Sequence, residues 1–251
     1  MRVTIITPTF NSEKYLNACI QSVIEQDYHD IEHIVVDGLS TDSTMEIVRS
    51  HKNHLAASIS EKDRGMYDAI NKGMAIATGD IIGILNSDDV LASNDVISTI
   101  VQTFQQNPVD TIYGDLQYVD PDDINKIYRT WKGKPFKRSR FKYGWMPAHP
   151  TFYIKRSLVN QYGGYENHFY SAADYEFMSR YLFVHKVSSY YLPKLLVKMR
   201  RGGQSNSNLK QRLRANRRDY LAMKKNKIPL PFLVAILKPL SKLPQYYKKK
   251  G

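Results

Sequence analysis

Short apolar runs alternate with stretches of helical periodicity along the first half of the chain. The runs Arg2–Pro8, Ile34–Asp37 and Ile81–Leu85 predict buried strands, because each is short, rich in branched residues and followed by polar residues. Apolar residues spaced three and four apart predict helices over Lys14–Gln26 and Tyr67–Ala77. We therefore expect an α/β fold with a Rossmann-like, mostly parallel central sheet flanked by helices.

The same alternation continues, less regularly, to about residue 120. It predicts helices over Thr41–Arg49 and Ser93–Gln106, with a strand around Ser58. Two short strands, Thr111–Gly114 and Gln117–Val119, begin a less regular second half. No apolar run approaches the roughly 20 residues that a helix needs to span a bilayer.

The character of the chain changes after Arg200. Residues 202–208 are rich in Gly, Ser and Asn, and a strongly basic stretch of helical pattern follows them. We place a boundary here, with one domain over residues 1–205 and a basic, amphipathic, partly helical tail over residues 206–251.

The formal net charge is +12 at pH 7, and its distribution is uneven. Residues 210–251 contain 13 Lys and Arg against the single acid Asp219, whereas residues 1–209 contain 23 residues of each sign. A general nucleic-acid binder would carry its positive charge on the folded domain, so we expect no nucleic-acid partner.

Cysteine content and the first residues bear on the compartment. The only cysteine, Cys19, cannot form an internal disulfide, and the first residues do not resemble a secretory signal. We expect a cytoplasmic protein. Cys19 falls within a predicted amphipathic helix, which favours a role as a small core residue.

Polar residues follow four successive predicted strands. They are Thr7 to Asn11, Asp37, Asp63 and the pair Asp88-Asp89. The carboxyl ends of parallel strands meet at one edge of a sheet, so these side chains are expected to converge. Carboxylates gathered there repel each other unless a cation such as Mg²⁺ or Mn²⁺ compensates them, and such an ion also bridges substrate phosphates. The alternative for Asp88-Asp89 is a turn or helix cap.

Four motifs in this order resemble those of glycosyltransferase family 2, whose members have the GT-A fold and transfer a sugar with inversion at its anomeric carbon. They are Ile5-Ile6-Thr7-Pro8-Thr9-Phe10-Asn11, Val35-Val36-Asp37-Gly38-Leu39-Ser40-Thr41-Asp42, Asp63-Arg64-Gly65 with Asp68-Ala69-Ile70-Asn71-Lys72-Gly73, and Asn86-Ser87-Asp88-Asp89. The resemblance covers about the first 90 residues and thins thereafter. It implies a nucleotide-diphosphate sugar donor, with a UDP-sugar favoured, and residues 1–115 as the donor-binding half.

The resemblance also implies roles for these residues. Donor-binding residues would be Thr7, Pro8, Thr9, Asn11, Asp37, Asp63, Arg64 and Asp88, with Asp37 on the base and Asp88 on the ribose. Asp89 would bind the Mn²⁺ or Mg²⁺ ion. The motif here is Ser-Asp-Asp rather than Asp-X-Asp, which leaves one fewer carboxylate for the ion.

The acceptor half, residues 116–205, contains the expected catalytic base. Family members carry a Glu-Asp pair at the start of a helix, and here Asp174 matches the aspartate while Ala173 replaces the glutamate. Asp174 and Glu176 are two apart and point to different sides of a helix, so only one can face the substrate. We choose Asp174, although a helix cap is its alternative role.

Further contacts with donor or acceptor are less specific. Candidates are Asp68, Asp115, His149, Arg200 and Arg201. For Asp68 a solvated helix surface is an equal alternative, and for His149 and Asp115 the alternative is a structural role. The two arginines resemble the family's closing loop, which folds over the diphosphate.

The tail suggests a membrane partner. Residues 228–240 are apolar, short and interrupted by proline, and lysines flank them. This pattern favours an anionic membrane surface contacted through residues 210–251, on the inner face of the cell membrane. Together with the family resemblance, it implies a lipid-linked saccharide acceptor in bacterial surface polysaccharide synthesis. The alternative is a hairpin that packs on the domain or on a second subunit in a homodimer. The rival functions are a nucleotidyltransferase and a non-enzymatic lipid-binding or nucleic-acid-binding protein.

Overall fold

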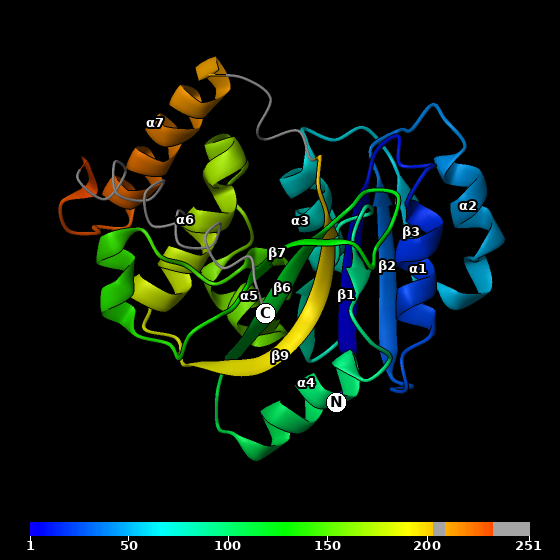
Figure 1. Ribbon diagram of the computed structural model, residues 1–251, viewed down its shortest axis with the longest axis horizontal. Coiled ribbons are helices and arrows are strands. Elements are labelled where there is room, and N and C mark those ends of the chain that lie inside the picture. The colour runs from blue at the N-terminus through cyan, green and yellow to red at the C-terminus, as the bar shows by residue number, and fades with distance from the viewer. Residues whose placement is uncertain (203–208, 233–251) are drawn as a thin grey trace.

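The computed structural model describes residues 1–202 and 209–232. Within them, nine strands form one twisted sheet with helices packed on it (Figure 1). Along the sheet the order is β3 (Ala57–Ser60), β2 (Ile31–Asp37), β1 (Val3–Thr9), β4 (Ile81–Ile84), β8 (Tyr153–Lys155), β6 (Thr111–Val119), β9 (Ser189–Arg200) and β5 (Val90–Leu91), with β7 (Ile127–Trp131) paired to β6.

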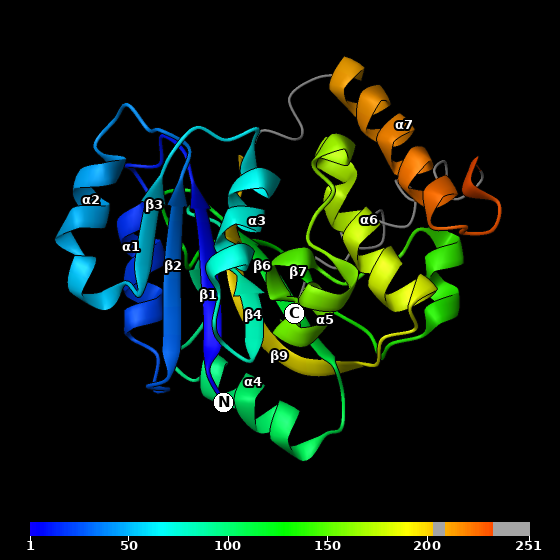
Figure 2. The ribbon, with the colours of Figure 1, turned by 180° about the vertical axis from the view of Figure 1, so that it is seen from behind.

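The half that was expected to bind the donor is parallel. β3, β2, β1 and β4 run side by side in one direction (Figure 2), and β8 pairs antiparallel to both β4 and β6. β6 and β9 are again parallel. The α/β fold class expected from the sequence is therefore confirmed, with antiparallel neighbours confined to the second half and to β5.

Helices connect these strands and cover the sheet. They are α1 (Leu16–Ile24), α2 (Thr44–Ser50), α3 (Met66–Ile76), α4 (Val96–Gln106), α5 (Arg156–Tyr162), α6 (Ala173–Ser179) and α7 (Leu209–Lys225). Short 3-10 segments cover Lys52–His54, Arg138–Tyr143, His149–Thr151 and Asn167–Ala172, and a π-helical turn, Arg180–Val184, extends α6.

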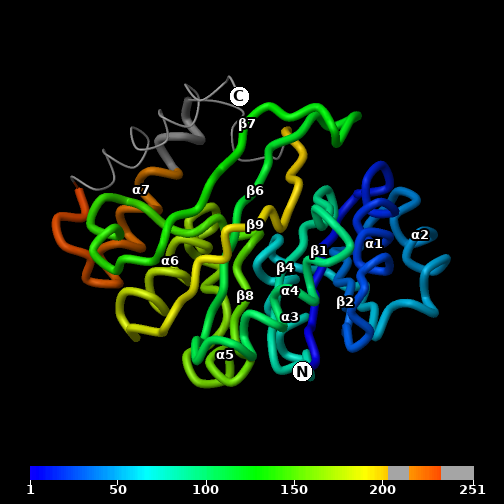
Figure 3. Tube along the Cα trace, turned by 60° about the horizontal axis from the view of Figure 1, so that its bottom comes forward, coloured from blue at the N-terminus to red at the C-terminus, as the bar shows by residue number. Residues whose placement is uncertain are grey.

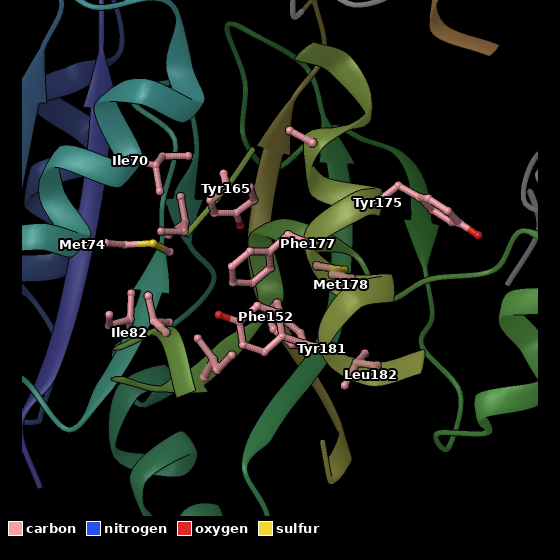
Figure 4. Close-up of a cluster of buried hydrophobic side chains, with 14 of the residues drawn as sticks. Ile70, Met74, Ile82, Phe152, Tyr165, Tyr175, Phe177, Met178, Tyr181 and Leu182 are labelled. Atoms are coloured by element: carbon pink, nitrogen blue, oxygen red, sulfur yellow. The ribbon is translucent and has the colours of Figure 1, made fainter. Parts of the chain in front are cut away.

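Two apolar layers hold the sheet between its helices. Val3 and Ile5 of β1 pack in the layer that contains α1 and α4, whereas Ile6 packs in the layer that contains α3 and α6. This division follows from the two-residue repeat of a strand. Figure 4 shows the second layer, where Ile70 and Met74 of α3 approach Tyr165 and Phe177.

Gly73 lets α3 lie close to the sheet. A Cβ atom at this position would come within 2.5 Å of Cγ2 of Ile6, so a larger residue would push the helix away from β1. The glycine near the end of the third motif therefore has a packing role.

β6 corrects one expectation. The sequence predicts two strands separated near Asp115, but the structure has one strand over Thr111–Val119. Its register with β9 shifts on both sides of Asp115. A Cβ atom at Gly114 would lie 2.6 Å from Cδ1 of Leu196, so the glycine permits this close approach. Gly114 and Asp115 mark an irregularity within the strand rather than its end.

The first part of the predicted tail packs on the domain. Ala222, Met223 and Ile228 are buried in the layer that contains α6. Asn226, just beyond α7, donates from Nδ2 to the backbone oxygen of Glu176 at 3.0 Å and to Oγ of Ser179 at 2.7 Å. Residues 203–208 and 233–251 of the tail lie outside the described residues. In the described part of the chain, no helix combines the length and apolar character needed to cross a bilayer.

β2 contains a histidine that burial keeps neutral. His33 is 2 % exposed, and its Nε2 lies 3.0 Å from Oγ1 of Thr7. Burial lowers the pKa of His33 to about 4, because the charged ring would lose its hydration.

Acid should therefore destabilise the protein through His33. The unfolded chain gains this proton near pH 6.5 and the folded protein only near pH 4, so stability is lost as the pH falls between these values. The loss amounts to about 2 to 3 kcal/mol at pH 4.5. Urea unfolding at pH 7.5 and 4.5 should show a smaller loss for His33→Gln than for the unsubstituted protein. Equal losses would contradict this origin.

Candidate active site

The carboxyl edge of the parallel strands gathers the acidic residues expected there. Thr9, the last residue of β1, is the register partner of Asp37, the last residue of β2. Asp37 is fully buried, and its carboxylate accepts from Oγ of Ser60 at 2.6 Å and from the backbone N–H of Ser40 at 3.1 Å. The hydroxyl of Ser40 donates to it as well. These donors fix the Asp37 side chain and satisfy its charge.

Asp63 lies against the residue after Asp37. A Cβ atom at Gly38 would come within 2.5 Å of Oδ2 of Asp63, so only glycine admits this carboxylate. The other oxygen, Oδ1, accepts from the backbone N–H of Gly65 at 2.8 Å. The structure therefore brings together two of the acids that the sequence placed at separate strand ends.

Arg64 and Asp68 form a pair beside them. Nη2 of Arg64 lies 2.9 Å from Oδ1 of Asp68, and this cation lowers the pKa of the Asp68 carboxyl. The same oxygen accepts from Nδ2 of Asn167 at 2.8 Å, so Asp68 joins α3 to the segment that precedes α6. Asp68 is thus largely covered rather than solvated.

Of the residues at and after the end of β1, some point into the core and others lie at the edge of the sheet. Oγ1 of Thr7 points towards His33 and Cys19 in the layer beneath α1, which leaves only its backbone for a ligand at the edge. Asn11 has a φ of 47° and accepts at Oδ1 from the backbone N–H of Thr41 at 2.9 Å. It ties the loop after β1 to the loop after β2.

Asp88 and Asp89 occupy the loop between β4 and β5. Asp89 is fully buried, and it accepts from Nδ2 of Asn86 at 3.1 Å and from the backbone N–H of Arg200 at 3.2 Å. Burial and the adjacent Asp88 carboxylate raise the pKa of Asp89 well above its usual range. Burial also raises the pKa of Asp88. Two amide donors do not balance this concentration of negative charge.

Arg200 supplies part of the compensation. Its guanidinium is almost buried at the end of β9, donating from Nη1 to the backbone oxygen of Asp88 at 2.6 Å and from Nε to that of Pro121 at 3.2 Å. It also lies over the ring of Tyr15 at 4.9 Å. Arg201 follows, exposed, with its guanidinium 4.1 Å from the ring centre of Tyr128. The first of the two arginines is therefore anchored beside the acidic pair.

The acidic pair fits a hard divalent cation. Asp88 and Asp89 are consecutive, and Asn86, which bonds Asp89, has a buried Oδ1 without a hydrogen-bond partner. Oxygen donors such as these are what Mg²⁺ and Mn²⁺ prefer. Among residues 1–202 and 209–232, no three His, Cys, Asp or Glu side chains cluster in a way that could hold a metal. Substrate and water oxygens would therefore complete the coordination, as is usual for Mg²⁺.

Asp174 and His149 meet in the second half, 25 residues apart in sequence. Oδ2 of Asp174 lies 3.4 Å from Nδ1 of His149, and both side chains are partly buried. Oδ1 of Asp174 accepts from the backbone N–H of Tyr175 at 2.7 Å. Asp174 lies in the first turn of α6.

Glu176, the other acid of α6, is occupied elsewhere. It is fully buried, with Nε of Arg180 at 3.0 Å and Nζ of Lys225 at 3.1 Å. A carboxylate held by two cations in the core has no access to a substrate. This leaves Asp174 as the acid of α6 that a substrate could reach.

Asp115 has a local structural task. It accepts at Oδ1 from the backbone N–H of Gly133 at 2.7 Å and from the hydroxyl of Tyr191 at 2.8 Å. These bonds hold the loop after β7 against β6 and β9. A contact of Asp115 with a donor sugar stays a prediction.

Three polar residues of this edge had no role in the sequence-based prediction. Ser40 and Ser60 hold Asp37, and Asn86 holds Asp89. Ser40 and Asn86 lie inside the motifs, so their proximity to the acids was the available signal. Ser60 comes from a separate strand, and only the pairing of β2 with β3 reveals its role.

Comparison with known proteins shows a family. The family model described as "Glycosyl transferase family 2" matches residues 4–163. A glycosyltransferase of Mycobacterium tuberculosis described as uncharacterized is 34% identical over 181 residues, covering 71% of this chain and 68% of its own. A PGL/p-HBAD biosynthesis glycosyltransferase of the same species is 30% identical over 181 residues, covering 70% and 68%.

Solved structures share the fold. S. aureus TarS superimposes with a TM-score of 0.70 at 19% identity over 100% of this chain, which spans 44% of the TarS chain. The mannosyltransferase PcManGT from Pyrobaculum calidifontis, solved in complex with GDP-Man and Mn²⁺, gives a TM-score of 0.65 at 21% identity, covering 97% of this chain and 70% of its own. At these identities the likeness is one of fold.

A divalent cation should stabilise the protein through the acidic pair. We expect Mn²⁺ at 100 times its Kd to raise the free energy of unfolding by about 2.7 kcal/mol. Asp89→Asn should remove this increase. The control Asp123→Asn, at an exposed residue, should show the same increase as the unsubstituted protein. Urea unfolding with and without Mn²⁺ measures both. Equal stabilisation of the Asp89→Asn variant would show that the cation binds elsewhere.

Proposed function

The chain belongs to glycosyl transferase family 2, and on that basis we propose that it transfers a sugar from a nucleotide-diphosphate donor to an acceptor hydroxyl with inversion. The observation that carries the proposal is the acidic pair of the half-buried Asp88 and the fully buried Asp89, at the same edge of the sheet as Asp37 and Asp63. Membership of this family favours transfer of a sugar over transfer of a nucleotidyl group.

A UDP-sugar is the favoured donor. TarS, whose fold this chain shares, has been solved in complex with UDP-GlcNAc. In our proposal the backbone at Thr7 and Pro8, with Thr9 and Asn11, lines the nucleotide. Oγ1 of Thr9 is buried without a hydrogen-bond partner, which leaves it free for a ligand. Asp37 binds the base, Asp63 and Arg64 border the same pocket, and Asp88 binds the ribose.

Asp89 holds Mn²⁺ or Mg²⁺ with Asp88 and Asn86 nearby, and PcManGT provides a precedent for Mn²⁺ in this fold. A bound cation supplies positive charge to the diphosphate as it departs. Arg200, already bonded to the Asp88 backbone, adds a second positive charge at the same place. The chain therefore concentrates cationic groups where negative charge develops.

Asp174 takes the proton of the acceptor hydroxyl. A carboxylate in this role needs to be ionised and reachable, and the contact with Nδ1 of His149 keeps the Asp174 side chain in one orientation. The proton passes from the acceptor oxygen to Asp174 as that oxygen attacks the anomeric carbon.

We assign the acceptor to the second half of the domain, residues 116–205, and the donor to residues 1–115. The acceptor is a lipid-linked saccharide, in keeping with the basic tail. The tail, residues 206–251, places the enzyme on the inner face of the cell membrane. A homodimer would be compatible with this placement on the membrane. Residues 206–208 and 233–251 of that tail lie outside the described residues.

Donor binding can be tested by calorimetric titration of UDP, GDP and CMP with and without Mn²⁺. We expect UDP to bind most tightly and only with the cation, because the diphosphate and Asp89 share the ion. Asp89→Ala should abolish the effect of Mn²⁺. Binding that is indifferent to the cation for all three nucleotides would refute the proposed donor site.

Replacement of the base tests the second half. Asp174→Asn should lower kcat by about 10²- to 10⁴-fold, because the amide cannot accept the acceptor proton. The Kd for UDP should stay within about twofold. Asp30→Asn, at the amino end of β2, is the matched control and should leave both quantities unchanged. Loss of donor binding together with turnover would give Asp174 a structural role instead.

A further inference from the structure

The two parts of the chain carry opposite charges. Residues 1–123 contain 20 Asp and Glu against seven Lys and Arg, whereas residues 124–251 contain 29 Lys and Arg against four Asp and Glu. The four acids of the second part are Glu166, Asp174, Glu176 and Asp219. The cationic part therefore includes the folded acceptor half as well as the tail.

Exposed apolar and cationic side chains gather at one place on this cationic part. Tyr143, at the end of the 3-10 turn Arg138–Tyr143, is 64% exposed and follows the exposed Lys142. After α7, Leu230 is 69% and Phe232 is 70% exposed. Figures 1 and 3 show the green segment that contains this 3-10 turn beside the red end of the described chain.

Both segments are anchored in the same core. Phe141 of the 3-10 turn, Met223 of α7 and Ile228 belong to one buried cluster. Their neighbours Lys142, Tyr143, Leu230 and Phe232 are left on the outside. We call the outer side of residues 138–143 and 224–232 the cationic face.

Charge decides which partner this face fits. Lys142, Lys224 and Lys227 are exposed on it. Glu166 and Glu176, two of the four acids of the second part, are already paired with Lys225. Aromatic and aliphatic side chains mixed with lysines match the boundary between lipid headgroups and acyl chains, and an anionic leaflet adds about 1 kcal/mol of attraction per cation.

We propose that the cationic face, residues 138–143 with 224–232, docks on an anionic bilayer surface and inserts Tyr143, Leu230 and Phe232 into its headgroup region. The proposal rests on the lipid-linked acceptor proposed above and places part of the membrane contact on the folded domain.

Docking through this face would bring the bilayer to the helix that carries the proposed base. The hydroxyl of Tyr175, the residue after Asp174, donates to the backbone oxygen of Phe141 at 3.5 Å. Asn226 bonds the backbone of Glu176 in the same helix. The face and α6 are thus tied together by direct bonds, and an acceptor held in the bilayer would be presented to the acceptor half.

Site-specific labelling tests which residues meet lipid. Cys19 is buried, so a cysteine placed at Tyr143 or Leu230 in the full chain can be labelled selectively with an environment-sensitive fluorophore. On vesicles of phosphatidylglycerol and phosphatidylcholine, we expect a blue shift and increased emission at both positions. Ile76→Cys, 41% exposed at the end of α3, is the control and should show neither. Bound protein without a shift at position 143 would overturn the proposal.

Charge reversal provides a second measurement. Lys142→Glu with Lys224→Glu should weaken partition onto these vesicles at least tenfold. Lys52→Glu with Lys62→Glu changes the net charge equally on exposed residues of the first part and should change partition less than twofold. Equal losses for the two double variants would show that net charge alone drives binding and would overturn the proposal. A dimer in which position 143 is shielded from the solvent would assign the face to a second copy of the chain. UDP and Mn²⁺ binding by the same variants shows separately whether the proposed donor site stands.

Discussion

Burial of carboxylate charge at the carboxyl edge of the sheet is the constraint on which the rest of the site depends. Asp37 and Asp89 are both fully buried, yet their charges are met differently. Asp37 has two hydroxyls and a backbone amide directed at it, so its charge is balanced within the protein. Asp89 has two amide donors and a second carboxylate beside it. The Asp37 carboxylate is therefore held in one place by the protein's own donors, whereas the uncompensated charge at Asp89 favours a bound cation.

A second buried charge organises the acceptor half. Glu176 is surrounded by Arg180 and Lys225, and Arg180 also donates to backbone oxygens of residues 162–164. Removal of one partner from such a group would leave an unpaired charge in the core, which costs several kcal/mol. Lys225 comes from the last turn of α7, so the segment expected to be a separate tail contributes to the interior of the domain. The position of α6, and with it Asp174, depends on that contribution.

The sequence predicted the parallel half well and the second half poorly, for physical reasons. β1, β2 and β4 are buried on both faces, so their continuous apolar runs stand out. β9 and β7 are only partly buried and mix Lys, Arg and Tyr with apolar residues, which hides a strand. The motif acids could be located because each follows a strand. The contact of Asp174 with His149, and the anchoring of Arg200 beside Asp88, depend on how distant segments pack, and no local pattern encodes them.

The division of charge along the chain affects how the protein is oriented as it approaches a charged surface. A molecule that is acidic at one end and basic at the other behaves as an electric dipole, and a negatively charged surface exerts a torque on it. Screening limits the reach of this field to about 8 Å at physiological ionic strength. The protein would therefore diffuse without preferred orientation until it is within roughly one nanometre of such a surface. Within that distance its basic end would turn towards the surface before any side chain makes contact.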